Sequence, residues 1–236
     1  MQIDPSICKM ALGCYGYGSW DAPYWFIGPE QGMASDKDIQ LRVEAWLGLG
    51  ENELDDCREF HEHIGEMKWH GKRPKLQKTW KQLMLLLMAF LGAPKDIIGK
   101  PKDKTSLCEY QRDHWGRLND ETCVIELSGL PAHCYRTSKK QTHELFEQGQ
   151  FEVIREKRIA SIGKRILLHK PTLVVMYGRK EMAHWEEIAG VAREFPKGVR
   201  PSILAFPSHP VSFEGVKNTY WEELGTSLRN NRLAHR

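Results

Sequence analysis

Long hydrophobic runs are missing from this chain of 236 residues. The longest, residues 83–91, is about half of the ~20 residues that a membrane-spanning helix needs, so we expect no membrane partner. The N-terminus shows no basic segment followed by an apolar one, so no secretory signal is recognised and a cytoplasmic location is expected. Disorder is excluded as well, because 41% of the residues are hydrophobic and 28% are charged, as in ordinary globular proteins.

Cysteine pairs of the Cys-x-x-Cys type, which commonly hold zinc or iron–sulfur clusters, are also missing. The six cysteines are scattered, and we expect free thiols in a reducing compartment, with ligation of a metal by scattered residues as the alternative. His61, His63 and His70 lie close together in the sequence, but on a helix the spacing of His61 and His63 puts their side chains on different faces. The sequence therefore predicts no metal and no cofactor.

Several familiar motifs do not occur. There is no Gly-x-x-x-x-Gly-Lys phosphate loop, no dinucleotide fingerprint and no Gly-x-Ser-x-Gly nucleophile turn. Internal repeats and low-complexity segments are missing too. These absences exclude P-loop nucleotide hydrolysis, serine-hydrolase chemistry on a nucleophile turn, and repeat architectures.

The formal net charge of +3 hides an uneven distribution. Residues 29–67 contain eleven acidic and three basic residues, which gives −8 and leaves +11 for the rest of the chain. Basic residues gather at 68–81, 95–104 and 155–170, a pattern compatible with a polyanion partner but also typical of solvated helix faces. If the partner is DNA, a positive surface should border the site and the acidic region should lie away from it. Acidic helices that cover the site would make nucleic acid the wrong partner.

Four short apolar runs predict strands, at residues 24–27, 123–127, 173–177 and 203–206. Their nearly continuous apolarity is typical of parallel strands covered on both faces. Helical stripes lie between and after them, at 76–91, 154–166 and 221–228, and a further helix is expected at 35–48. This alternation predicts an α/β fold with a doubly wound parallel sheet. We expect one domain spanning residues 1–236, with an acidic helical insertion around 35–70.

In such a sheet a ligand binds beyond the carboxyl ends of the strands, so the four following loops are the candidate site. The second loop begins with Ser128, and the third contains Arg179, which either contacts a phosphate or caps a helix. A carboxylate and a histidine stand on the other two loops and form a workable hydrolytic pair. The first loop is Gly28-Pro29-Glu30-Gln31-Gly32 and the last contains Ser208-His209-Pro210-Val211-Ser212.

Residues 24–32 (YWFIGPEQG) resemble the first motif of the uracil-DNA glycosylase superfamily, an apolar strand leading into a short catalytic loop. The segment 208–212 (SHPVS) is similar to the His-Pro-Ser motif of that superfamily. Residues 124–131 are similar to the strand that ends in a base-reading residue, and 174–178 to the strand before the last motif. The resemblance implies a three-layer α/β/α sandwich with a central four-stranded parallel sheet, DNA as partner and a flipped nucleotide at the strand ends.

The resemblance also implies roles for individual residues. Glu30 falls where the superfamily positions the hydrolytic water, and His209 where it donates a hydrogen bond to the departing base. Glu126 aligns with a base-reading Asn; a Glu there favours either an amino-bearing base or a protonated carboxyl, because an ionised carboxylate only accepts hydrogen bonds. An apolar wedge into the duplex is implied at Pro210, Val211 and Phe213. The other expected substrate-binding positions are Gly28, Pro29, Gln31, Gly32, Ser128, Ser208 and Ser212.

Each role has a structural alternative. Glu30 could cap a helix, His209 could be held in its turn without a chemical role, and Glu126 could pair with a basic residue of a covering helix. Trp69 and the basic residues around it could grip nucleic acid by stacking and charge. Three functions stay open: metal-independent cleavage of an N-glycosidic bond in DNA, non-catalytic binding of a nucleotide or nucleic acid, and hydrolysis of free nucleosides.

Overall fold

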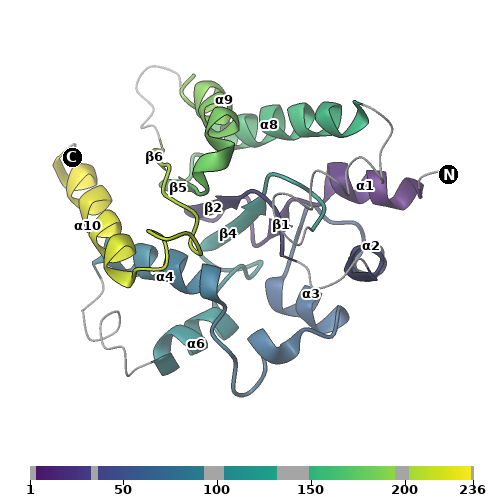
Figure 1. The fold of residues 1–236 in the computed structure, drawn as a ribbon, viewed down its shortest axis with the longest axis horizontal. Helices are drawn as coiled ribbons and strands as arrows, with labels where there is room; N and C mark the ends of the chain where they lie inside the picture. The colour runs from purple at the N-terminus through teal and green to yellow at the C-terminus, as the bar shows by residue number, and fades with distance from the viewer. Residues whose placement is uncertain (1–3, 33–36, 93–103, 132–148, 195–201, 235–236) are drawn as a thin grey trace.

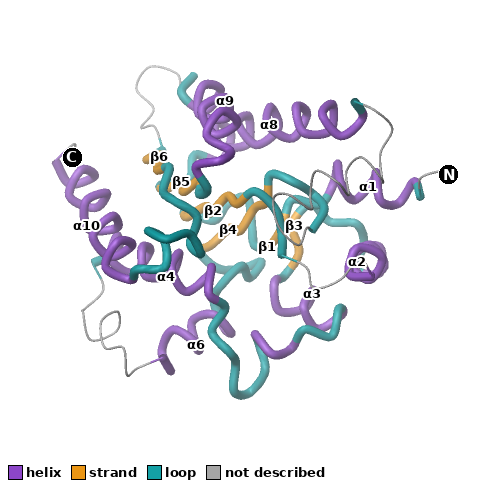
Figure 2. The backbone as a smooth tube through the Cα atoms, viewed as in Figure 1, coloured by secondary structure: helices purple, strands orange, loops and turns teal. Residues whose placement is uncertain are grey.

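The computed structural model describes residues 4–32, 37–92, 104–131, 149–194 and 202–234, and its chain path is drawn in Figures 1 and 2. Within these residues the sheet has six strands in the order β3-β1-β4-β2-β5-β6. The strands are β1 (Gly16–Tyr17), β2 (Tyr24–Gly28), β3 (Leu54–Asp55), β4 (Thr122–Glu126), β5 (Leu173–Met176) and β6 (Ile203–Ala205).

The four predicted runs form β2, β4, β5 and β6, and each pairs in parallel with its neighbours in the order β4-β2-β5-β6. The sheet as a whole is mixed, because β1 runs antiparallel to β4 and β3 pairs with β1. The α/β class is therefore confirmed, whereas the sheet differs from the four-stranded, all-parallel one expected. A strand of two residues carries no periodicity, and this is why the sequence shows only four.

Helices cover both faces of the sheet, with α8 and α9 on one side and α4 and α10 on the other (Figure 1). Alternate residues of β2 supply the two cores: Trp25 and Ile27 pack with α8 and α9, and Phe26 packs with α4 and α10. The described helices are α1 (Pro5–Gly13), α2 (Lys37–Gly48), α3 (Cys57–His63), η1 (Met67–Trp69), α4 (Lys78–Leu91), α6 (Lys104–Asp113), α8 (Gln150–His169), η2 (Arg179–Glu181), α9 (Met182–Ala192) and α10 (Asn218–Ala234).

The buried helix α4 shows how local sequence sets an element. The side chain of Gln77 caps its start by accepting a hydrogen bond from the Trp80 N–H at 2.7 Å. Its end is Gly92, whose left-handed backbone (φ 71°) satisfies the last carbonyls of the helix. The predicted helices at 76–91, 154–166 and 221–228 are thus confirmed as α4, α8 and α10.

The acidic segment folds as α2, β3, α3 and η1, so most of it is helical, and β3 adds a strand at the edge of the sheet. The start of the expected helix at 35–48 falls at residues 35 and 36, outside the described residues, and α2 is described from Lys37. None of the described helices combines the length and apolarity that crossing a membrane requires.

Candidate functional site

A cavity of about 950 Å³ opens at the carboxyl ends of the parallel strands. The four loops that follow β2, β4, β5 and β6 begin at this edge of the sheet, because parallel strands have their carboxyl ends at the same edge. Helix α2, the segment around η1 and the start of α4 complete the wall. A cavity of this volume is in the range of small-molecule sites.

Most of the residues expected at the site meet in this one cavity. The two catalytic candidates, Glu30 and His209, both line it. Three expected residues are not part of the lining. Gly28, at the end of β2, and Pro210 are both buried. The Ser128 hydroxyl donates a hydrogen bond to the Leu130 carbonyl at 3.0 Å. The other expected residues that line the cavity are Pro29, Gln31, Gly32, Glu126, Ser208, Val211 and Ser212.

Backbone hydrogen bonds join the four loops in two pairs beyond the strand ends, the first loop with the second and the third with the last. The Ser128 N–H donates to the Pro29 carbonyl at 2.8 Å, and the Gly178 N–H donates to the Pro207 carbonyl at 3.1 Å. A Cβ on Gly178 would lie 3.3 Å from Cγ of Pro29 and 3.7 Å from Cδ2 of His209, so the first and last loops meet across this glycine. Glu30 and His209 are therefore carried by adjoining, rigidly held backbone.

Two carboxyl groups at the site influence each other. Burial, reinforced by the negative charges of Glu181, raises the pKa of Glu30 to about 7. Burial, followed by the charge of Glu30, raises the pKa of Glu126 to about 8. Both carboxyls therefore hold a proton to a higher pH than an exposed glutamate does, and the effect is larger for the more deeply buried Glu126.

The side chain of Glu126 is 8% exposed, and its Oε2 has no hydrogen-bond partner among the described residues. The buried guanidinium of Arg158, the expected kind of structural partner, binds the main-chain carbonyl of Glu126 at 2.7 Å and leaves the carboxyl free. Gly28 makes room for this group, because a Cβ there would lie 2.5 Å from Oε2 of Glu126 and would overlap the Tyr177 hydroxyl. A free buried carboxyl beside a phenol is suited to receiving polar atoms of a ligand.

His209 is held in a defined state. The Val211 N–H donates to Nδ1 of His209 at 3.3 Å, so Nδ1 is the acceptor and Nε2 carries the proton. Burial and the charge of Lys180 lower the pKa of the ring, which keeps it neutral at physiological pH. The neutral ring packs edge-on against Tyr177 with 5.5 Å between ring centres. Its free N–H can donate to an acceptor in the cavity.

The loop that carries His209 is anchored to the helical layer. The Ser208 hydroxyl donates to Glu214 at 2.7 Å, and the Ser208 N–H donates to the Tyr220 hydroxyl of α10 at 3.1 Å. The indole N–H of Trp221 donates to the Gly215 carbonyl at 2.7 Å. Beyond these anchors the loop exposes apolar side chains, since Phe213 is 85% exposed and Val211 is 53% exposed.

Sequence reasoning missed several residues of the wall. Tyr17, Trp80 and Tyr177 bring aromatic rings to the cavity in addition to Trp69, which the sequence had singled out. Arg42 of α2 fixes that loop by donating to Oε1 of Gln31 at 2.7 Å and to the Gly32 carbonyl at 3.3 Å. The strand at 24–28 gives no hint of these residues, because they come from other elements, namely β1, α2, α4 and the end of β5.

The charge of the lining differs from the expected positive border. Asp38 and Glu66 show that the acidic segment forms part of the wall and is not held away from it. Among the described residues of the lining, carboxylates outnumber basic side chains. The carboxylates are Glu30, Asp38, Glu66, Glu126, Glu181 and Glu214, and the basic residues are Arg42, Lys68, Arg179 and Lys180.

Comparison of the chain with protein-family models, with curated proteins and with solved structures returns no match.

Proposed function

We propose that this protein is a divergent member of the uracil-DNA glycosylase-like superfamily and that it hydrolyses the N-glycosidic bond of a nucleotide bound in the cavity, without using a metal. One observation carries the proposal. Glu30 and His209, far apart in the sequence and implied by resemblance to act on opposite sides of that bond, line one cavity at the carboxyl ends of parallel strands. In this proposal the parallel strands β4-β2-β5-β6 form the core of a single three-layer domain, with residues 35–70 as the insertion.

The two residues supply the two halves of the reaction. Ionised Glu30 orients a water molecule and accepts its proton as the water oxygen bonds to C1′ of the sugar, and its charge stabilises the oxocarbenium-like transition state. The bond between C1′ and the base nitrogen breaks, and its electron pair leaves with the base. His209 donates a hydrogen bond from Nε2–H to the base as this charge develops, which a neutral ring of the observed tautomer can do.

Protonated Glu126 decides which base fits. A neutral carboxyl has one O–H donor and one carbonyl acceptor, as an Asn amide has one donor group and one acceptor. It therefore matches a base edge on which a carbonyl stands beside a ring N–H, as in uracil, hypoxanthine and xanthine. The raised pKa of Glu126 supports this choice of the two alternatives that the sequence left open.

The experiment is single-turnover base release from single- and double-stranded oligonucleotides that carry uracil, hypoxanthine or xanthine. We expect abasic product from at least one of them, and a loss of about 100-fold or more in Glu30→Gln and in His209→Ala. Glu156→Gln and His63→Ala, which change exposed residues outside the cavity, serve as controls and should match the wild type. No product from any substrate with enzyme in excess would refute the proposal.

A second candidate is hydrolysis of free nucleosides, which the lining itself favours. In the part of the lining that the structure describes, six carboxylates face four basic side chains, which disfavours a phosphate backbone. The exposed Phe213 and the stacking of the Lys68 ammonium on Trp69, 5.0 Å from the ring centre, favour DNA instead. Base release from mononucleosides but not from oligonucleotides would select the nucleoside hydrolase.

A further inference from the structure

Three strong metal-ligating side chains converge next to the cavity, in a part of the molecule that the proposed reaction does not use. Cys57 and His61 stand one turn apart on α3, and His70 follows η1. One candidate ligand atom from each lies within 4.8 Å of the others, and all three side chains are buried. His63, which the sequence places beside them, is exposed on another face of α3.

The distances resemble those of a tetrahedral zinc site. With Zn–S of ~2.3 Å and Zn–N of ~2.0–2.1 Å at tetrahedral angles, a sulfur and a nitrogen ligand lie about 3.5–3.6 Å apart. Sγ of Cys57 lies 3.7 Å from Nε2 of His70, which is close to that separation. The ring of His61 lies next to both groups, with 5.1 Å between its centre and that of His70.

His61 has its tautomer set for ligation. Its Nδ1 lies 2.6 Å from the main-chain carbonyl of Cys57, and because a carbonyl can only accept, Nδ1 carries the proton. The lone pair of the ring is then on Nε2. A backbone carbonyl that holds the other ring N–H is the usual second partner of a metal-bound histidine.

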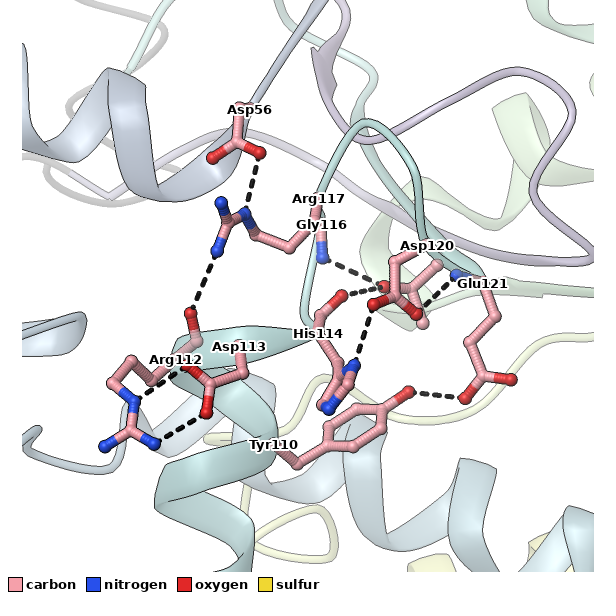
Figure 3. Close-up of polar contacts among 10 residues, drawn as sticks. Asp56, Tyr110, Arg112, Asp113, His114, Gly116, Arg117, Asp120 and Glu121 are labelled. Carbon is pink, nitrogen blue, oxygen red and sulfur yellow. Dashed lines mark hydrogen bonds and ion pairs between the residues drawn. The ribbon is translucent and has the colours of Figure 1, made fainter.

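Both ends of the cluster are held by surrounding structure. Asp56 caps α3 through the N–H groups of Arg58 and Glu59, and it accepts a hydrogen bond from Arg117 at 2.7 Å (Figure 3). The Cys57 N–H donates to the Gly116 carbonyl at 3.0 Å, which fixes the first ligand. Gly116 and Arg117 belong to the loop between α6 and β4. Figure 3 shows a further contact within this loop, in which Nδ1 of His114 lies 2.7 Å from Oδ2 of Asp120.

The segment with His70 is fixed by a buried amide. Gln111 of α6, fully buried, donates to the Trp69 and Lys75 carbonyls at 2.8 Å and 2.9 Å. Trp80 packs against the rings of both histidines, with 5.5 Å and 5.8 Å between ring centres. These contacts hold the three groups together, and a largely apolar shell would strengthen ligation by excluding competing water.

We propose that Cys57, His61 and His70 bind one Zn²⁺ ion in the wall of the cavity. His61 lines the cavity, which gives the ion a path of entry and leaves the fourth coordination position toward that space. On binding, the thiol of Cys57 loses its proton to solvent and the thiolate bonds to the ion, so one proton is released per ion. This inference stands on residues other than Glu30 and His209, and it does not depend on the proposed reaction.

The test is metal binding to the full chain after treatment with a chelator. Zn²⁺ should bind with a stoichiometry of one, and Co²⁺ in its place should show a thiolate-to-metal charge-transfer band and the ligand-field bands of a tetrahedral site. Cys57→Ser should abolish the charge-transfer band, and His70→Ala should weaken affinity about 100-fold or more. The matched controls Cys8→Ser and His63→Ala, which alter a half-buried thiol and an exposed imidazole outside the cluster, should bind as the wild type does.

Two further measurements keep the proposal open to refutation if a variant folds poorly. Zn²⁺ at about 100 times its dissociation constant should raise the Tm of the wild type by about 5–10 °C and leave the Tm of Cys57→Ser unchanged. The charge-transfer band in the wild type needs no variant at all. Absence of that band, or equal Zn²⁺ affinity in the wild type and Cys57→Ser, would overturn the proposal. The effect of Zn²⁺ on base release is not part of this test, because the metal site does not depend on the proposed reaction.

Discussion

Replacing Glu126 by Gln removes a buried titrating group while keeping its size and its capacity to hydrogen-bond. Because the folded state raises the pKa of Glu126 from 4.5 to about 8, the folded protein binds more protons than the unfolded chain between these values. The contribution of Glu126 to the free energy of unfolding is then fully present below pH 4.5 and is lost as the pH rises through about 8. At ~1.36 kcal/mol for each tenfold change in proton affinity, the loss amounts to about 4–5 kcal/mol.

Urea unfolding followed by circular dichroism at pH 5, 7 and 9 measures this effect. The variant should resemble the wild type at pH 5 and exceed its unfolding free energy by several kcal/mol at pH 9, because no charge is then buried at position 126. Glu156→Gln changes an exposed carboxylate of α8 and should follow the wild-type curve. Parallel pH curves for the wild type and Glu126→Gln would show that Glu126 does not hold the proton, and the account of base reading would fail with it.

Three other substitutions test the packing around the site. Gly28→Ala should destabilise the protein by about 1–3 kcal/mol in urea unfolding, because the added Cβ overlaps the Tyr177 hydroxyl; an unchanged midpoint would contradict the tight contact. Gly215→Ala places a Cβ 2.8 Å from the carbonyl carbon of His209, so it should slow base release at least 10-fold, and a wild-type rate would show that this loop need not be held closely. Arg158→Met should lower the free energy of unfolding by about 3–5 kcal/mol and the Tm by about 10 °C. The reason is that the buried guanidinium donates to main-chain carbonyls that include those of Ala11, Cys14 and Leu127. A Tm within about 2–3 °C of the wild type would argue against that role.

The parts of the fold that could be predicted are those buried on both sides. The runs that became β2, β4, β5 and β6 are almost continuously apolar because neighbouring residues such as Trp25 and Phe26 face separate cores. Helix α4 shows a clear apolar stripe in the sequence because it, too, is largely buried. The strands β1 and β3 are held by pairing with β4 and with each other, and two residues leave no pattern to recognise.

The candidate site was predictable only in its strand-end loops. Glu30 and His209 could be proposed because each follows a visible strand, and both line the cavity. Arg158 reads as one more basic residue on the polar side of α8, yet it is 1% exposed, since its partners come from α1 and the end of β4.

The convergence of Cys57, His61 and His70 was hidden in part. The spacing of Cys57 and His61 by one helical turn was a readable signal. The sequence could not show that Gln111, some forty residues further along, holds the segment of His70 against that face. Nor could it show that burial would protonate Glu126, because the sequence gives neither depth nor neighbouring charges.

The central claim is that Glu30 acts as a carboxylate on a water molecule while Glu126 acts as a neutral acid on the base. The most direct test is the single-turnover rate of base release as a function of pH, for the wild type and Glu126→Gln. The rate should rise through about pH 7 as Glu30 ionises and fall above about pH 8 as Glu126 loses its proton, and the fall should be missing in the variant. A rate that stays constant from pH 6 to 9, or a fall that persists in Glu126→Gln, would contradict the claim.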